Sequence, residues 1–424
     1  MADYLPEGVI VNILQRLSVK TLICCTCVSK SWYSLITSPE FISSHLNFTS
    51  VTKKDESLLL LRHCLGESEC YSLYSDEEFC SWNDAMNFPF RSINSYFTII
   101  GNCNGLLCLS DDRVLYLHTI ILWNPCIRKS TVLPKPNLIY NSYGTFVQSF
   151  GFGFDPISSD HKLVRITYAD DALYRRPQVE IYRLSTGLWQ DISYLALDRV
   201  IYNRSRPAYV NGATHWIASS IEHGADSIVS FDMCREVFWE MTIPASLVNL
   251  ESFGSKDVVA YTGSLALISW NHMGNDPGFC VWVMKEYGVV ESWAKHFVMT
   301  YQIVGGGIMR PLWVRKNGEI LVARQDGRVV SYDQLGAEVE DLGIRGSSYE
   351  EFVHSVHVDG YMESLVLLGK GPKFDDACIR NMLPILKFNN GCSSSVNSYG
   401  SFFGRSSGNE FKHNHGNYAE HGAT

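Results

Sequence analysis

The sequence has little basic charge and no long apolar run. Its 424 residues include 35 lysines and arginines against 44 aspartates and glutamates, which gives a formal net charge of −9. Such a chain has no basic field of the kind that attracts nucleic acid or an anionic membrane. No uncharged apolar run approaches the roughly 20 residues that span a bilayer, and the first residues lack the basic and apolar regions of a secretion signal. We therefore expect a cytoplasmic or nuclear protein whose partners include neither nucleic acid nor a membrane.

Paired cysteines are also lacking. The 13 cysteines run from Cys24 to Cys392 without a spaced framework, and an odd number of such thiols is typical of a reduced protein. Cys24 and Cys27 form a Cys-x-x-Cys pair, but no second pair follows at zinc-site spacing. The sequence predicts buried thiols here and no metal site.

Cofactor and catalytic motifs are missing as well. The stretch GFGFDP contains Gly151 and Gly153 but lacks the third glycine of a dinucleotide-binding loop, and residues 305–307 lack the Lys-Ser/Thr of a phosphate loop. His413 and His415 have no companion metal ligands. No serine or cysteine lies in a recognisable nucleophile signature. The sequence therefore predicts no cofactor and no active site of its own, and it disfavours a hydrolase.

What is present near the start is the pattern of short amphipathic helices. Ile10, Ile13, Leu14 and Leu17 follow the i, i+3, i+4, i+7 spacing of a helix, and Pro6 is well placed at its beginning. Composition favours a large core elsewhere, because 46% of the chain is hydrophobic.

Two further short helices are predicted after this one. Ser18 suits the N-cap of the second helix, and Val28 and Trp32 belong to the third. A unit of about forty residues buries too little of its own surface to be stable alone. Some of its apolar side chains would therefore stay partly exposed unless a partner covers them. These side chains are Leu5, Pro6, Ile10, Leu14, Val28 and Trp32. From the residues alone, packing against the rest of the chain is favoured; the family resemblance described below implies instead that they bind a partner.

From about residue 57 the spacing changes to that of β-strands. Short apolar runs alternate with turns, and an aromatic residue precedes a turn at intervals of 49 to 59 residues. These marker residues are Tyr74, Trp123, Tyr182, Phe231, Trp282 and Tyr332. A second series of runs keeps the same period: GLLCL, KLVRI, THWIAS, LALISW, GEILVA and ESLVLL.

Two series with one period predict a mainly β chain that forms a β-propeller of about six four-stranded blades over residues 55–388. A large β-sandwich with coincidental spacing is the alternative. Ring closure requires a terminal strand, and ESLVLL (363–368) is predicted to pair with SLLLL (57–61). Residues 389–424 contain seven Ser, six Gly and six Asn, a composition that predicts a disordered tail.

The beginning of the chain, LPEGVIVNILQRLSVKTLICCTCVSKSWYSLITSPEF, resembles an F-box, expected over residues 1–46. The region after it resembles the plant F-box-associated domain through CNGLLCL, LWNPCIRKSTVLP, GFGFDPISSDHKLVRI, VNGATHWIA and YMESLVLL, in that order. It is similar both to general F-box/kelch-repeat proteins and to S-locus F-box proteins, and the subgroup stays open. Family members usually carry proline where Ser18 stands, and an aromatic-basic pair where Cys25 and Thr26 stand.

The resemblance implies a non-catalytic receptor subunit of an SCF-type ubiquitin ligase. The F-box of such a subunit binds a Skp-family adaptor and, through it, a cullin scaffold, while the propeller binds a client protein for ubiquitination and proteasomal degradation. The alternative is an F-box scaffold or decoy uncoupled from the ligase by the changes at Ser18, Cys25 and Thr26. Guanidinium forks match carboxylates, and the predicted client-binding residues are the loop arginines Arg175, Arg176, Arg204 and Arg206.

Overall fold

The computed structural model of the chain describes residues 5–52, 58–65, 68–76, 84–86, 88–92, 96–111, 119–138, 146–169, 176–201, 206–220, 226–243, 256–271, 278–300, 308–324, 326–333, 339–346 and 355–368. The predicted tail over residues 389–424 lies outside this set. None of the helices in the described ranges is long and apolar enough to cross a membrane.

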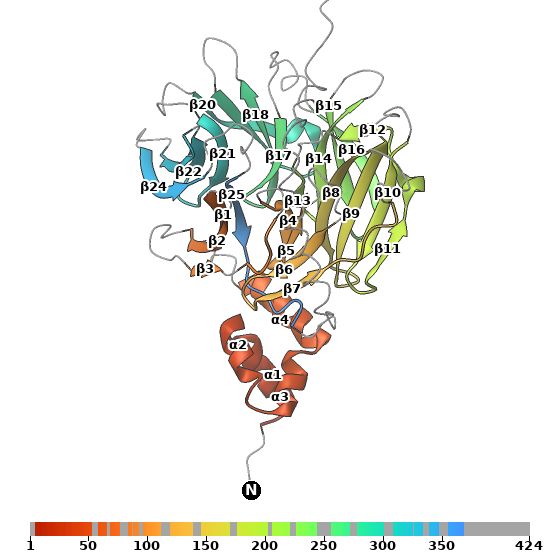
Figure 1. Cartoon of the computed structure of the whole chain (residues 1–424), viewed down its shortest axis with the longest axis vertical. Coiled ribbons are helices and arrows are strands. Elements are labelled where there is room, and N and C mark those ends of the chain that lie inside the picture. The colour runs from red at the N-terminus through yellow and green to blue at the C-terminus, as the bar shows by residue number, and fades with distance from the viewer. Residues whose placement is uncertain are drawn as a thin grey trace, which may run out of the picture. The chain divides into compact units, whose positions relative to one another are not determined.

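The helical region has four helices, one more than the sequence predicts: α1 (Glu7–Gln15), α2 (Val19–Cys25), α3 (Lys30–Ile36) and α4 (Pro39–Thr52) (Figure 1). Pro6 directly precedes α1, and the Ser18 hydroxyl caps α2 by accepting a hydrogen bond from the Thr21 amide at 3.3 Å. The sequence hides α4 because two of its buried positions, His45 and Thr49, are polar. They interrupt the apolar stripe by which a helix is recognised.

The described strands form a β-propeller of six antiparallel sheets, which confirms the predicted fold and blade number (Figure 1). Blade 1 holds β25 (His357–Tyr361), β1 (Leu58–Leu65), β2 (Ser68–Ser75) and β3 (Asp84–Met86); blade 2 holds β4 (Thr98–Cys103), β5 (Leu106–Ser110), β6 (Ile120–Asn124) and β7 (Lys129–Val132); blade 3 holds β8 (Phe146–Asp155), β9 (Asp160–Ala169), β10 (Gln178–Arg183) and β11 (Leu188–Asp191). Blade 4 holds β12 (Arg199–Ile201), β13 (Ala208–Val210), β14 (Ala213–Ser220), β15 (Asp226–Asp232) and β16 (Val237–Thr242); blade 5 holds β17 (Lys256–Tyr261), β18 (Ser264–Asn271), β19 (Gly278–Met284) and β20 (Trp293–Thr300); blade 6 holds β21 (Ile308–Val314), β22 (Ile320–Arg324), β23 (Arg328–Tyr332) and β24 (Val339–Arg345). Two 3-10 helices, η1 (Ser193–Leu195) and η2 (Val290–Ser292), follow β11 and β19.

The repeat read from the sequence corresponds to one blade. Each aromatic marker lies in the last strand but one of its blade: Tyr74 in β2, Trp123 in β6, Tyr182 in β10, Phe231 in β15, Trp282 in β19 and Tyr332 in β23. The first five runs of the second series fall in the strands just before these, β5, β9, β14, β18 and β22. A period of about 50 residues is therefore the length of chain that one four-stranded sheet and its connections need.

The ring closes between the two ends of the propeller, but not through the segment that the sequence predicts. β25 pairs antiparallel with β1, so that His357 lies opposite Arg62 and Tyr361 opposite Leu58. The predicted closing strand, residues 363–368, is wrong: this segment comes after β25 and forms no strand. Its apolar residues are buried in an irregular conformation, which periodicity cannot distinguish from a short buried strand.

The glycines of GFGFDP lie where blade 4 packs against blade 3. A Cβ on Gly151 would lie 2.4 Å from Cζ2 of Trp216, and a Cβ on Gly153 would lie 2.4 Å from Cε2 of Tyr209. The Trp216 indole Nε1 donates a hydrogen bond to the Phe150 carbonyl at 2.8 Å. These glycines give the aromatic rings of blade 4 access to the backbone of β8.

We expect Gly151→Ala to lower the free energy of unfolding by about 1–3 kcal/mol, because the added methyl group overpacks this contact. Urea unfolding followed by tryptophan fluorescence measures the change. Gly8→Ala is the matched control, since nothing lies within 4 Å of its Cβ position in α1 and alanine favours a helix. An unfolding midpoint of Gly151→Ala equal to that of the wild type would contradict the role given to Gly151.

Candidate functional site

Six large apolar side chains are exposed at the surface of the helical region: Val51 lies near the end of α4, and the other five lie between residues 5 and 33. Their exposed fractions are 55% for Leu5, 42% for Val9, 49% for Ile13, 64% for Val28 and 56% for Tyr33. We call these five residues the exposed helical surface. They are five of the eleven large apolar side chains that are exposed among the described residues. A concentration of this kind on a short segment is typical of an interaction site.

The core of the helical region is complete beneath this surface. Leu14, Val19, Leu22, Ile36 and Phe41 are buried together in one cluster. The exposed side chains are therefore not core residues left uncovered by a loose fold. They are apolar side chains that the buried cluster of the helical region does not include.

The structure divides the six residues predicted to face a partner. The expected exposure is wrong for Leu14, which is 1% exposed, because this side of α1 faces the core. The other five keep surface area: Leu5, Pro6 and Val28 are exposed, and Ile10 and Trp32 are half-buried against the core.

Sequence reasoning did not assign Val9, Ile13 and Tyr33 to the partner-facing surface. A signal for the first two was available, because α1 reads EGVIVNILQ and is apolar around most of its circumference. A helix of this kind needs cover on more than one side. Tyr33 gave no comparable signal.

The three positions that depart from the family pattern have local structural roles. The Ser18 side chain caps α2, and the Thr26 hydroxyl donates a hydrogen bond to the Ile23 carbonyl at 2.6 Å. Cys25 is half-buried against the helical core. These residues stabilise the ends and the packing of α2.

The Cys-x-x-Cys pair lies at the surface. Cys24 and Cys27 are both exposed as free thiols, so their predicted burial is wrong. They lie at and just beyond the end of α2, which is only seven residues long. Within the part of the chain that the structure describes, no group of three His, Cys, Asp or Glu side chains is arranged to hold a metal ion.

The segment after β25 joins the helical region to the propeller. We call residues 363–368 the junction segment. Its Leu365 is part of the buried cluster of the helical region. The Asn124 side chain at the end of β6 donates hydrogen bonds to the carbonyls of Ser364 at 3.0 Å and Val366 at 2.8 Å. One buried amide therefore fixes the segment that fills the helical core.

We expect Asn124→Ala to destabilise the chain by about 2–4 kcal/mol, because two buried carbonyls lose their donor. Urea unfolding measures the loss. Asn12→Ala serves as the control, since Asn12 is exposed on α1, where its side-chain oxygen accepts a hydrogen bond from Arg16 Nε at 3.1 Å. Equal stability of the two variants would show that the junction segment does not depend on Asn124.

Strand direction decides which end of the propeller the helical region contacts. β25 runs directly into the junction segment, and Ile127, in the turn after β6, packs against the helical core. Neighbouring strands of a blade run in opposite directions, so the third strand of a blade finishes at the same end of the propeller as the innermost strand. The end of β25 and the turn after β6 therefore lie at the end where the innermost strands finish. The innermost strands therefore begin at the end away from these helical contacts; they are β25, β4, β8, β13, β17 and β21.

A cavity of about 160 Å³ lies between the innermost strands. We call its ionisable lining the channel cluster, which consists of Arg206, Asp257, Arg310, His357 and Asp359. These residues come from blades 4, 5, 6 and 1 and are far apart in the sequence. No motif joins them, so sequence reasoning could not have found the cluster.

The structure does not bring the four predicted client-binding arginines into one described site. Arg206, which the sequence assigns to a client-binding loop, lines the cavity just before β13. Arg176 is 68% exposed and forms an ion pair with Asp198 at 3.3 Å. Arg175 and Arg204 lie outside the described residues.

Burial controls the protonation of the channel cluster. It raises the pKa of Asp359 to about 7 and the pKa of Asp257 to about 6. Burial, reinforced by neighbouring arginines, holds the pKa of His357 well below its usual range. The imidazole is therefore neutral, and its Nδ1 accepts a hydrogen bond from Arg206 Nη1 at 3.1 Å.

We expect the stability advantage of Asp359→Asn over the wild type to grow by roughly 1–3 kcal/mol between pH 5 and pH 8. A carboxyl whose pKa is raised on folding favours the folded state while it is protonated, and this contribution disappears as pH rises through about 7. The asparagine side chain does not titrate. Urea unfolding at both pH values measures the difference.

Asp155→Asn is the control for this pH dependence. Burial of Asp155 acts to raise its pKa but is outweighed by hydrogen bonds from Lys162 and Ser158, so the pKa is lowered. The carboxylate is ionised from pH 5 to pH 8 in either state, and the variant should lose the same stability at both. A constant difference for Asp359→Asn as well would contradict the raised pKa.

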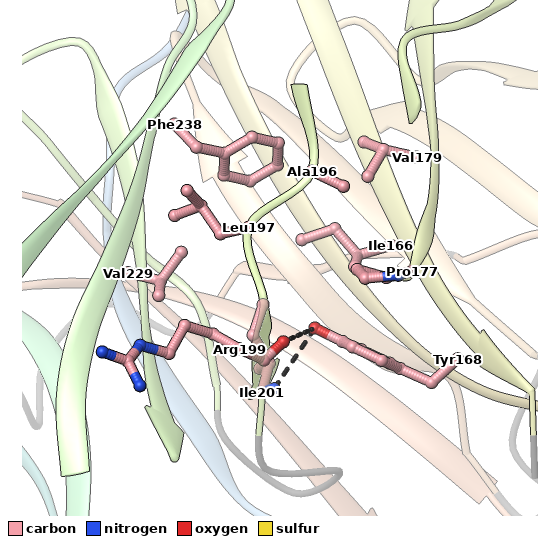
Figure 2. A pocket seen from close by; sticks show the side chains of 10 residues that line it. All are labelled: Ile166, Tyr168, Pro177, Val179, Ala196, Leu197, Arg199, Ile201, Val229 and Phe238. Carbon is pink, nitrogen blue, oxygen red and sulfur yellow. Dashed lines mark hydrogen bonds between the residues drawn. The ribbon is translucent and has the colours of Figure 1, made fainter. Parts of the chain in front are cut away.

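A second, smaller cavity lies between blades 3 and 4 and has a different character. Figure 2 shows its mainly apolar side chains around the segment that carries Leu197. The Tyr168 hydroxyl donates to the Arg199 carbonyl at 3.0 Å and accepts from the Ile201 amide at 3.3 Å. The volume is about 10 Å³, which is at the limit for one water molecule. This cavity is a seam between blades and not a ligand site.

A helical unit with exposed apolar side chains, joined to a closed propeller, defines a two-part interaction protein. The F-box domain family matches residues 3–44, and the F-box associated beta propeller domain family matches residues 47–337. The chain belongs to the plant F-box proteins that carry this propeller, as the sequence resemblance indicates.

Three relatives from Arabidopsis thaliana are similar along most of their length. F-box protein At3g07870 is 30% identical over 384 residues, which cover 81% of this chain and 88% of the relative. F-box/kelch-repeat protein At3g23880 is 29% identical over 337 residues, covering 76% and 86%. F-box protein CPR1 is 28% identical over 371 residues, covering 81% and 86%.

Proposed function

We propose that this protein is the substrate-recognition subunit of an SCF-type ubiquitin ligase. Its F-box binds a Skp-family adaptor joined to a cullin scaffold, and its propeller binds a client protein that is then ubiquitinated and degraded. The observation that carries the proposal is the exposed helical surface on a unit whose own core is already filled. Its place of action is the cytoplasm or the nucleus.

The exposed helical surface has the chemistry of a protein interface. Aliphatic and aromatic side chains supply most of the binding energy where a partner removes them from water. Val9 and Ile13 lie four residues apart on α1 and so share one helix face. Further apolar area comes from Leu5 before α1, Val28 after α2 and Tyr33 on α3.

The chain needs no catalytic group for this role. A receptor accelerates transfer by holding the client near a ubiquitin-loaded enzyme, which raises the effective concentration of client lysines. The helical region contacts one end of the propeller through Ile127 and the junction segment. The client then binds at the opposite end, where the innermost strands begin.

The scaffold or decoy alternative rests on Ser18, Cys25 and Thr26. Ser18 caps the start of α2, Thr26 donates a hydrogen bond to the Ile23 carbonyl near its end, and Cys25 packs against the helical core. Helix caps of this kind stabilise the helical unit. Their local roles favour retained adaptor binding.

We expect the double variant Leu5→Asp, Val28→Asp to recover at least about tenfold less Skp-family adaptor than the wild type on co-purification, because two charges replace apolar contacts at the interface. The matched control is Ile157→Asp, Leu188→Asp, which introduces the same charges at side chains of blade 3 that are 82% and 67% exposed. Its adaptor recovery should equal that of the wild type.

Two results would overturn parts of the proposal. Equal adaptor recovery by both double variants would remove the exposed helical surface as the docking site. A wild-type chain that recovers no adaptor, beside an F-box protein that does, would favour the uncoupled scaffold.

A further inference from the structure

The channel cluster gathers where the innermost strands begin. Arg206 lies two residues before β13, His357 is the first residue of β25, and Arg310 is the third residue of β21. Asp257 is the second residue of β17. Because these strands run toward the helical contacts, the cluster lies toward the opposite end of the ring. A ligand bound there would not compete with the F-box for space.

Neutral groups hold two of the arginines in place. Arg206 Nη1 donates to the neutral imidazole of His357 at 3.1 Å, and Arg310 Nη2 donates to the Val356 carbonyl at 2.8 Å. These contacts fix the guanidinium groups without cancelling their charge. Burial lowers the pKa of Arg310, and the nearby Arg206 lowers it further.

A third arginine, Arg62, lies near the cavity on the neighbouring strand β1. Arg62 on β1 is 1% exposed, and its Cζ lies 4.5 Å from the centre of the Tyr96 ring. It lies close enough to act on the pKa of both Arg206 and Arg310. β1 pairs with β25, which places Arg62 opposite His357 in the sheet.

The charges in and around the cavity do not balance at neutral pH. Two guanidinium groups, Arg206 and Arg310, line the cavity with two carboxyl groups, Asp257 and Asp359, whose raised pKa values leave them partly protonated. Behind them, Arg62 lies close to the carboxyl group of Glu69. Charges enclosed by protein are screened less by salt and water than charges at the surface. A bound anion would offset the remaining positive charge.

The cavity has the size and the donors for such an anion. Its volume of about 160 Å³ is roughly ten times the 10–15 Å³ that one water molecule needs by the same measure. Guanidinium groups present paired N–H donors that match the oxygens of phosphate and carboxylate. His357 adds a donor, because Nδ1 is the acceptor for Arg206 and the proton of the neutral ring is therefore on Nε2.

We propose that the channel cluster is a binding site for one compact oxyanion with two negative charges, a group of the phosphate class, held by Arg206 and Arg310. The anion site stands on the cavity alone. That a client protein carries the group, as a phosphorylated side chain, rests on the function proposed above.

Equilibrium dialysis of the full-length chain against radiolabelled inorganic phosphate, at pH 7 and constant ionic strength, tests the site. We expect one phosphate per chain, with binding about tenfold weaker in Arg310→Gln and in Arg206→Gln. Arg176→Gln removes an exposed arginine of the same charge and should bind like the wild type. No saturable binding by the wild type, or equal loss in all three variants, would overturn the proposal.

A variant that is expected to bind phosphate more tightly distinguishes the loss of a binding group from misfolding. Asp359→Asn removes a negative charge from the cavity and should bind phosphate about threefold more tightly, a result that a damaged fold cannot give. Weaker binding by this variant would contradict the charge argument. Acetate, a monoanion, should compete at least tenfold less well than sulfate, and equal competition would overturn the preference for a dianion.

The source of the anion is tested in a separate arm. A short phosphoserine peptide should displace labelled phosphate, whereas its serine counterpart should not. Displacement by free phosphate alone would overturn the client-borne form and leave the anion site intact. Adaptor recovery is measured independently, so loss of phosphate binding and loss of adaptor binding are distinguishable failures.

Discussion

The pairing of β25 with β1 is the contact on which the rest of this structure depends. It joins residues almost 300 positions apart, opposing Arg62 to His357, and it completes the first blade with a strand from the far end of the propeller, which closes the ring. Closure also places the innermost strands around one cavity, so that charged residues from four blades face each other. The segment that follows the closing strand is delivered directly to the helices. The two proposed sites, one at each end of the propeller, thus depend on one strand pairing.

The helical region and the propeller share buried contacts and are not joined by a flexible linker alone. Leu365 lies in the same buried cluster as Leu14 and Leu22, and Asn124 of blade 2 fixes the backbone on either side of it. Burial of apolar area is the main favourable term in folding, and here part of the helical core is supplied from beyond the last strand. The apolar residues that remain exposed are then free for a different polypeptide.

Much of the fold was predictable from residue spacing, because each blade repeats one pattern of aromatic and apolar positions. The closing strand was not predictable. The junction segment is as apolar as a buried strand, whereas the true closing strand contains the ionisable residues His357 and Asp359. The exposed helical surface was predicted in part: α1 is apolar on two sides, and spacing alone could not say which side, that of Leu14 or that of Ile13, faces the core. The channel cluster gave no sequence signal, because its members come from separate blades.

Four properties could be determined from the sequence by itself: the amphipathic helices, the blade period, the positions of turns and the family to which the chain belongs. These depend on neighbours a few residues apart, or on a pattern repeated along the chain, and so can be read in one dimension. Only the tertiary structure decided that Arg206 lies in a channel and not on a loop, that Leu14 is covered, and that residues 363–368 fill the helical core. Each of these outcomes depends on which distant parts of the chain come into contact when the ring closes. The free energy of such contacts cannot be predicted from any local segment, because the contacting residues are far apart in the sequence.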